Sequence, residues 1–287
     1  MSVIVPTRDR PRSLAACLAA LERQEGTTVE IVVVDDASTD AAAVADVVAG
    51  SPRARLVRAR GHGPAAARNL GARAARGSCL CFTDDDCRPE PGWSAALSQR
   101  VRSGAVVVAG PTHVSNGNAY AVAAQTITNH LVDASLDAHA EYVTFAPTCN
   151  IAASASLCRE EPFDEQYPLA AGEDRAWCAV LAGRGIGIAY EPAARVLHEP
   201  DLDAQAFWRQ QVRYGRGARR FHHHHHAGTG GMRQLAFYPA LLRKGFAHGP
   251  FVGALVTLAQ LATAVGFARE IAAIAGGSRP SGTPGDR

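Results

Sequence analysis

The chain has 287 residues, which is enough for one large domain or for one domain with a smaller appendage. Its hydrophobic content of 47% and charged content of 20% are ordinary for a globular protein and exclude a wholly disordered chain. The net charge of +2 is unevenly distributed, because no Asp or Glu lies between Ala204 and Ala268, where eight Arg and Lys side chains fall. This asymmetry indicates an anionic partner for the C-terminal part, either a lipid surface or a nucleic acid.

The first 110 residues alternate between strand-like and helix-like patterns. Val29–Val34 is nearly all β-branched, as in a strand buried on both faces of a parallel sheet. Strands are expected at Ser2–Val5, Val29–Val34, Arg55–Arg58, Cys79–Thr83 and Ala105–Ala109, and helices at Pro11–Gln24, Asp40–Ala49, Pro64–Ala75 and Pro91–Arg102. This alternation predicts a doubly wound α/β sheet with right-handed crossovers.

Polar clusters follow three of the expected strands, at the edge where ligands bind in such sheets. Three consecutive carboxylates repel one another, so a folded chain seldom keeps them without a counter-charge. A divalent cation such as Mg²⁺ or Mn²⁺ suits hard carboxylate oxygens and commonly carries a substrate phosphate. The clusters are Thr7-Arg8-Asp9, Asp35-Asp36 and Asp84-Asp85-Asp86. Together they predict a site for a nucleoside diphosphate, with a solvated acidic turn as the alternative for the triplet.

Residues 111–145 show no regular pattern, and we place no element there. Further along, strands are expected at Thr148–Leu157, Gly185–Tyr190 and Ala194–Leu197, and helices at Gly172–Leu181 and Asp203–Phe221. The acids in the first turn of Gly172–Leu181 favour a helix start through the helix dipole. The histidine run His222–His226 and the glycines that follow predict an exposed linker.

Gly249–Ala268 carries no charge over twenty residues, but it is rich in Ala, Gly and Thr. The hydrophobicity of this segment is therefore only marginally sufficient to span a bilayer. Beside the basic segment, an interfacial or re-entrant helix fits better, and a buried helical appendage is the alternative. From Gly276 onward the Gly, Ser and Pro content predicts a disordered end.

The seven cysteines include no CxxC pair, so we expect small buried hydrophobes in a reducing cytosol. We also expect no signal peptide, because Met1 leads directly into a strand.

Several segments, in this order, resemble the inverting glycosyltransferases of family 2, which have the GT-A fold. They are Ser2–Arg10, Glu30–Asp40, Gly63–Gly71, Phe82–Pro89 with its DxD-type triplet, Thr148–Ala152, Phe163–Glu165, Gly172–Asp174 and Tyr190–His198. The resemblance covers about residues 1–220 and implies a GT-A type, mostly parallel, Rossmann-like sheet. Two departures weaken the loop roles: the family often has Asn near Arg8, and a QxxRW motif where this chain has Gln210-Gln-Val-Arg213-Tyr214.

The resemblance implies roles for residues at the donor end. Thr7 and Asp36 would hold a uridine base, since a carboxylate can accept the ring N–H. Arg68 would lie near the nucleotide, with a surface salt bridge as the alternative. The full donor-binding set implied is Pro6, Thr7, Arg8, Asp35, Asp36, Arg68, Asp84, Asp85, His198, Gln210, Arg213 and Tyr214, and the metal set for Mn²⁺ or Mg²⁺ is Asp84 and Asp86. Asp86 is the favoured ligand, and the sequence leaves open which carboxylate of the triplet binds the ion.

The resemblance also implies a catalytic base. Asp174 would remove the proton of an acceptor hydroxyl, and Glu173 would orient that acceptor. A carboxylate that caps the helix N-terminus is the alternative for Asp174. One displacement at the anomeric carbon would invert its configuration while the metal stabilises the leaving diphosphate.

The sequence therefore predicts a metal-dependent glycosyltransferase that moves a sugar from a nucleotide sugar, a UDP-sugar, to an acceptor hydroxyl in envelope glycan or glycolipid synthesis. We expect a cytoplasmic protein peripheral to the membrane. The expected parts are a GT-A domain at 1–220, a linker at 221–231, a helical membrane-associating segment at 232–275 and a disordered tail at 276–287. The donor sugar and the acceptor are not specified by these patterns.

Two other functions fit parts of the sequence less well. A sugar-nucleotide nucleotidyltransferase usually carries a glycine-rich phosphate loop after its first strand, and Thr7–Pro11 lacks those glycines. A non-catalytic nucleotide- or nucleic-acid-binding protein is disfavoured because the basic segment has few interleaved aromatics and no known module. We accordingly expect no nucleic-acid partner.

Overall fold

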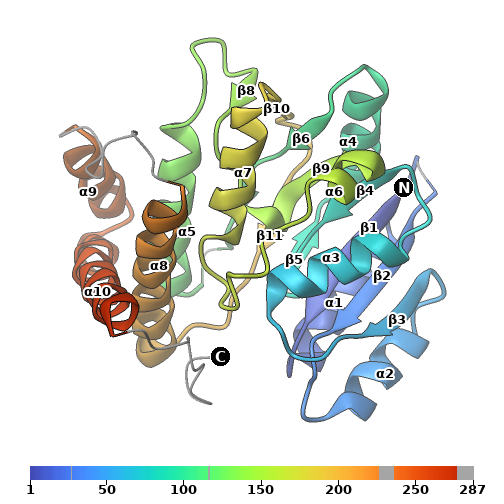
Figure 1. Cartoon of the computed structure of the whole chain (residues 1–287), viewed down its shortest axis with the longest axis horizontal. Coiled ribbons are helices and arrows are strands. Elements are labelled where there is room, and N and C mark those ends of the chain that lie inside the picture. Colours follow the sequence, from blue (N-terminus) through green and yellow to red (C-terminus); the bar gives the residue numbers. More distant parts are fainter. Residues whose placement is uncertain (27, 116, 226–235, 277–287) are drawn as a thin grey trace.

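The computed structural model describes residues 1–26, 28–115, 117–225 and 236–276. They form an α/β body built on a large sheet, with a group of long helices beside it (Figure 1). The C-terminal helices lie on the far side of that group from the first strands.

The main sheet has eight strands in the order β3-β2-β1-β4-β9-β6-β10-β8. The strands β3, β2, β1 and β4 are parallel, which confirms the predicted mostly parallel sheet. In contrast, β9 pairs antiparallel with both β4 and β6, and β8 pairs antiparallel with β10. The strands are β1 Ser2–Thr7, β2 Glu30–Asp35, β3 Ala54–Arg58, β4 Cys79–Phe82, β6 Val107–Ala109, β8 Tyr142–Val143, β9 Ile151–Ser154 and β10 Ile188–Tyr190. The carboxyl ends of β1, β2 and β4 consequently share one edge.

Both faces of this sheet are buried. Along β2, Val32 and Val34 join one apolar cluster, and Ile31 and Val33 join the other. This explains why the strand is almost uniformly β-branched. The helices on the two faces are α1 Pro11–Glu22, α2 Ala41–Ala49, α3 Pro64–Ala74, α4 Trp93–Arg102, α6 Ala155–Glu160 and α7 Glu173–Gly183. All seven cysteines are free and buried, as predicted.

A second, three-stranded sheet brings distant segments together. Its order is β5-β11-β7, formed by Cys87–Pro89, Val196–His198 and Thr112–His113. In the antiparallel pair β5–β11, His198 lies opposite Cys87. This pairing sets His198 directly beside the acidic triplet.

Three regions differ from the sequence-based expectation, and the third is the histidine run. A 15-residue helix, α5 Ala119–Asp133, occupies the stretch where we placed no element. Its buried side includes the polar Gln125, Thr126 and His130, so the apolar periodicity that marks a helix is weak. The expected strand Thr148–Leu157 is instead a short 3-10 turn (η1, Thr148–Asn150), then β9, then α6.

The histidine run is partly helical. The helix α8, Ala204–His224, continues through three of the histidines, so the linker predicted from residue 221 is wrong for His222–His224. The packing of Phe221 against Tyr167 and Ala176 holds this last turn in place. Residues 226–235, the rest of the predicted linker with the first part of the next segment, and 277–287, in the predicted disordered tail, lie outside the described residues.

The remaining helices are α9 Phe237–Ala247 and α10 Pro250–Ala275. They form a separate apolar cluster with α5 and α8. The crossing of α8 and α10 is close: a Cβ on Gly215 would collide with the carbonyl of Thr263, and one on Gly266 with the carbonyl of Val212. Glycine lets the two backbones touch, so α10 packs directly onto α8.

Candidate active site

A cavity of about 1140 Å³ lies between the carboxyl edge of the main sheet and the long helices. Its walls come from the loops after β1, β2 and β4, from the start of α7 and from α5, α8, α9 and α10. The sequence-predicted residues that line it are Pro6, Thr7, Arg8, Asp36, Arg68, Asp84, Asp85, Asp86, Glu173, Asp174, His198, Gln210, Arg213 and Tyr214. The structure thus brings together every predicted site residue except Asp35.

Asp35 is fully buried away from the cavity. Its Oδ2 lies 2.9 Å from Nη1 of Arg58, and its Oδ1 accepts the backbone N–H of Ser38 at 2.9 Å. These bonds fix the turn after β2. Asp35 therefore holds this turn and does not line the cavity, and the donor contact expected of it stays a prediction.

Asp36 does line the cavity. Its Oδ2 accepts the N–H of Gly63 at 3.0 Å, and its buried Oδ1 has no hydrogen-bond partner among the described residues. A buried carboxylate oxygen without a donor costs free energy, so Oδ1 is suited to receive an N–H from a ligand. Gly63 has φ +95 and lies against the backbone of Pro168, which leaves no room for a side chain.

Arg68 links the acidic triplet to the carboxylates at the start of α7. Its side chain, 4% exposed, donates from Nη2 to Oδ1 of Asp84 at 2.8 Å and from Nη1 to Oε1 of Glu173 at 2.9 Å. Burial opposes the charge, but the two carboxylates outweigh it and raise the pKa of Arg68. The surface-salt-bridge alternative does not hold, because this arginine is buried in the centre of the site.

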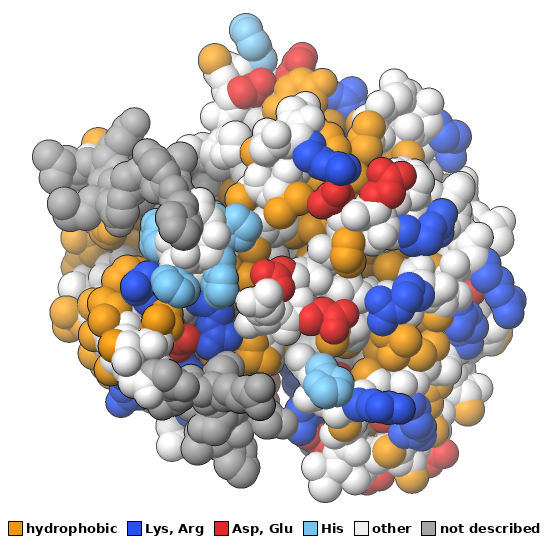
Figure 2. All heavy atoms as spheres, viewed as in Figure 1, with side chains coloured by type: hydrophobic (Ala, Val, Ile, Leu, Met, Phe, Trp, Pro, Cys, Tyr) orange, Lys and Arg blue, Asp and Glu red, His pale blue; other side chains and the backbone are white. Residues whose placement is uncertain are grey.

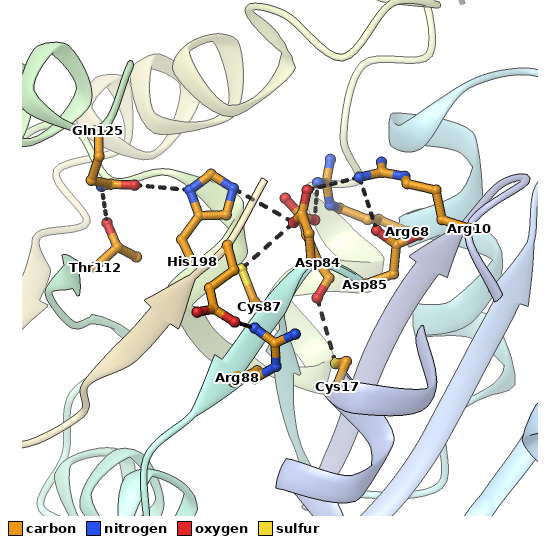
Figure 3. Close-up of polar contacts among 12 residues, drawn as sticks. Arg10, Cys17, Arg68, Asp84, Asp85, Cys87, Arg88, Thr112, Gln125 and His198 are labelled. Atoms are coloured by element: carbon orange, nitrogen blue, oxygen red, sulfur yellow. Dashed lines mark hydrogen bonds and ion pairs between the residues drawn. The ribbon is translucent and has the colours of Figure 1, made fainter. Parts of the chain in front are cut away.

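The carboxylates of the triplet pair with two arginines (Figure 3). Asp84 pairs with Arg68, whereas Asp85 and Asp86 share Arg10, with Oδ1 of Asp85 3.2 Å from its Nη1. Asp85 accepts the hydroxyl of Thr7 at 2.7 Å, and burial raises its pKa to about 7. Asp86 lies 2.7 Å from Nη1 of Arg10 and 3.5 Å from Nε2 of His198. Burial acts to raise the pKa of Asp86, but His198 and Arg10 outweigh it and hold it well below its ordinary value.

His198 is oriented from behind by a chain of hydrogen bonds (Figure 3). Its Nδ1 donates to Oε1 of Gln125 at 2.8 Å, and Nε2 of Gln125 donates to Oγ1 of Thr112 at 2.7 Å. The bond to Gln125 orients the ring so that Nε2 faces Asp86. An imidazole held in this way is the usual arrangement of a metal-binding histidine.

The donor set at this point fits a divalent cation. Ligand atoms of Asp86, Cys87 and His198 lie within 4.8 Å of one another. A carboxylate suits Mn²⁺ or Mg²⁺, an imidazole suits a transition-metal ion, and a thiol suits softer ions, so the pair Asp86 and His198 fits Mn²⁺ better than Mg²⁺. Asp84 is not part of this group, since its carboxylate is held by Arg68.

Glu173 and Asp174 begin α7, after Gly172 in the left-handed conformation (φ 92). Oδ1 of Asp174 accepts the N–H of the next residue, Arg175, at 2.7 Å, but no side chain caps the start of α7, so the capping alternative is not supported. The residue also lines the cavity, and burial, together with the charge of Glu173, raises its pKa to about 7. A carboxylate that titrates near neutrality is suited to general-base work.

Two site residues were not expected from the sequence. Arg10 lies one residue beyond the polar cluster after β1, and its pairing with Asp86 could have been suspected from that loop. Gln125 belongs to α5, and no local signal pointed to it.

A family model described as "Glycosyl transferase family 2" matches residues 2–163. The chain is 37% identical over 99 residues to the succinoglycan biosynthesis protein ExoO of Rhizobium meliloti, covering 34% of this chain and 27% of that protein. It is 26% identical over 226 residues to a pre-mycofactocin glycosyltransferase of Mycobacterium tuberculosis, covering 76% of this chain and 46% of that protein. The chain thus spans less than half the length of either relative.

Solved structures show the same fold at low identity. The mannosyltransferase PcManGT from Pyrobaculum calidifontis, in complex with GDP-Man and Mn²⁺, superposes with a TM-score of 0.59 at 20% identity over 96% of this chain and 78% of that one. S. aureus TarS 1–349 in complex with UDP-GlcNAc gives 0.56 at 14% identity over 96% and 92%.

Proposed function

The chain belongs to glycosyltransferase family 2, and we propose that it transfers a sugar from a UDP-sugar to an acceptor hydroxyl with inversion. The observation that carries this proposal is Arg68, which joins Asp84 on the donor side to Glu173 beside Asp174 on the acceptor side. One cavity would therefore hold the nucleotide at one position and the catalytic base, Asp174, at another, with a fixed separation between them.

The base of the donor would bind at Asp36. Its unpartnered Oδ1 can accept the ring N–H of uracil, and Thr7 closes the adjacent loop through its bond to Asp85. Guanine also offers a ring N–H, and a neighbour with this fold binds GDP-Man. UDP- and GDP-sugars must therefore be compared directly.

Asp86 and His198 would hold Mn²⁺ or Mg²⁺, with Asp84 at the side that faces the ribose. The ion supplies positive charge to the leaving diphosphate when it is bound. Arg10 lies beside the same carboxylate and adds a second cation near the phosphates. Arg8, Gln210, Arg213 and Tyr214 line the surrounding wall.

Asp174 would take the proton of the acceptor hydroxyl. Its pKa of about 7 keeps a large fraction of the carboxylate ionised at neutral pH, while burial keeps it basic enough to accept a proton. Glu173, held by Arg68, would orient the acceptor. Attack from the face opposite the leaving diphosphate inverts the anomeric carbon.

The test is turnover of a panel of UDP- and GDP-sugars with and without Mn²⁺, read as release of the nucleoside diphosphate. We expect one UDP-sugar to be consumed in the presence of the metal and Asp86→Asn to abolish this consumption. Asp46→Asn is the matched control, because Asp46 is an exposed carboxylate on α2 outside the cavity. Equal turnover by the two variants would contradict the metal role, and consumption of GDP-sugars alone would contradict the uridine assignment.

We further propose that the protein acts at the cytoplasmic face of a membrane, in envelope glycan or glycolipid synthesis. The helix α10 is long and apolar enough to cross a membrane by length and composition, with a mean hydropathy of 1.8 over its best window. On its outer side Phe251 and Leu261 are 57% and 61% exposed. Figure 2 shows apolar side chains gathered at the left edge, over α10.

Membrane contact is tested by sedimentation of the full chain with vesicles. Anionic vesicles should carry down more protein than zwitterionic ones, since Arg243 and Lys244 lie on α9, which packs against α10. Leu261→Asp should reduce this binding, with Asp46→Asn as the control. Binding that is unaffected by Leu261→Asp would argue for a purely structural α10.

A further inference from the structure

The cavity has two chemically different ends. The end at the strand edge carries Asp36, Arg68, the acidic triplet and Asp174. The wall that α5, α9 and α10 contribute, called the apolar end below, is lined by six apolar or aromatic side chains and by the neutral polar side chains Gln125, Thr128, Gln260 and Thr263. The six are Ile127, Leu131, Phe237, Tyr238, Leu241 and Phe267. Among the described lining residues that these three helices contribute, none is charged.

A nucleotide sugar does not account for the second end. Its phosphates, ribose and sugar hydroxyls need hydrogen-bond partners, and placing them against uncharged, mostly apolar side chains would leave them unpaired. The charged groups described above can satisfy the donor at the strand edge. The apolar end is then left for the other substrate.

The apolar end also communicates with the exposed apolar surface. Tyr238 lines the cavity and is 42% exposed. Nearby on the hairpin formed by α9 and α10, Phe246 and Phe251 are exposed, and Phe246 packs against Gly253. An apolar chain could therefore reach from the surface of these helices into the cavity.

We propose that the acceptor hydroxyl is carried by an amphiphile whose aliphatic chain binds between α5, α9 and α10, with the hydroxyl directed to Asp174. This inference rests on the proposed function, because it names the acceptor class for the same site. Burial of each methylene in such a site releases apolar surface from water, so affinity should rise with chain length.

The test uses methyl, hexyl and decyl β-glucosides below their micelle concentrations, with binding to the full chain measured by calorimetry. Each added methylene should tighten binding about three- to fourfold, until the chain fills the apolar end. Affinity that does not change with chain length overturns the proposal. Phenyl β-glucoside that binds as tightly as hexyl β-glucoside also overturns it, because the site would then select a ring rather than a chain.

Variants locate the chain. Leu131→Asn, in the apolar lining, should weaken decyl glucoside at least tenfold and flatten the dependence on chain length. Leu258→Asn is the control, because Leu258 is an exposed leucine of α10 outside the cavity lining. If Leu131→Asn does not fold, Thr128→Leu adds apolar surface to the same lining and should tighten decyl glucoside instead. Unchanged affinity in Thr128→Leu would overturn the assignment of the chain to this wall.

The failure of this inference is separable from failure of the proposed function. Turnover of the nucleotide sugar to water needs no acceptor, so it reports the donor end alone. Donor turnover together with chain-length-independent glucoside binding rejects only the acceptor class. Chain-length-dependent binding without any donor turnover rejects the transferase proposal, and the amphiphile would no longer be its acceptor.

Discussion

The two walls of the cavity are built in opposite ways. On the donor wall, the polar groups after β1 and β4 are tied by ion pairs among Arg10, Arg68, Asp84 and Asp86. On the acceptor wall, α5, α9 and α10 contribute mainly half-buried apolar or neutral side chains. The donor wall is therefore preorganised for one polyanionic group, while the acceptor wall selects by apolar contact and shape. Asp174 lies where the two walls meet.

The substitution Asp174→Asn should have the largest effect, because it should reduce transfer while leaving donor binding nearly unchanged. Loss of the base should reduce transfer by on the order of 10²- to 10⁴-fold, because an amide cannot accept the hydroxyl proton. Donor affinity should stay within about twofold, since the proposed donor contacts are made by Asp36, Asp86 and His198 and not by Asp174. Steady-state transfer and donor calorimetry measure the two quantities. A large loss of donor affinity with intact transfer would place Asp174 on the donor wall instead.

The stability of the acceptor wall should depend on one buried acid. Glu270 of α10, 2% exposed, accepts from Nε of Arg216 at 2.8 Å and from Nε of Arg220 at 3.0 Å, and Arg220 also donates to the carbonyl of Gln166. Glu270→Gln should lower the free energy of unfolding by about 3–5 kcal/mol, because buried guanidinium groups lose their counter-charge. Urea denaturation measures this.

The matched control for that change is Arg269→Gln, the exposed neighbour of Glu270. It should alter stability by less than about 0.5 kcal/mol. Equal effects of the two substitutions would mean that the ion cluster does not hold the wall.

Gln125 connects the two walls. It belongs to helix α5 of the acceptor wall, but it orients His198 on the donor wall. Gln125→Ala should raise the Mn²⁺ concentration for half-maximal activity about 10- to 100-fold, as loss of an orienting partner does in metal sites. Asn129→Ala, one contact further from the ring, should have a smaller effect. An unchanged metal requirement in Gln125→Ala would show that His198 does not bind the ion.

The smallest expected effect is a pH dependence. Asp174 faces Glu173, Arg68, Asp84 and Arg175, and burial with the charge of Glu173 raises its pKa to about 7. The carboxylate is the active form, so the rate of transfer should fall about tenfold per unit as the pH drops below about 7. It should level off above that value. A rate that rises on acidification would mean that the protonated form is active.

The donor wall could be predicted from the sequence because most of its residues directly follow strands, so that each residue and its strand belong to one short stretch of the chain. Local patterns place these residues. Asp36, Asp84 and Asp86 follow a strand end within a few residues, and Arg68 lies near the start of α3. Asp35 shows the limit of that argument, since adjacent residues after a strand point to opposite sides, and only one of the pair reaches the cavity.

The acceptor wall could not be predicted in the same way. Its contacts join α5, α8, α9 and α10, and their pairing depends on packing between segments far apart in the chain. The polar residues on the buried side of α5 hid its helical period, although Asn118 caps its start by accepting the N–H groups of Tyr120 and Ala121. The placement of His198 required the strand pairing of β5 with β11.

The glycine contacts between α8 and α10 have a consequence for orientation. Gly215 and Gly266 let the two backbones touch, so α10 cannot leave α8 without losing this close packing and the ion pairs of Glu270 with the arginines of α8. At a bilayer, the helix would therefore stay with the body instead of inserting alone. The angle between α10 and α8 would then fix the height and tilt of the cavity mouth above the lipid surface.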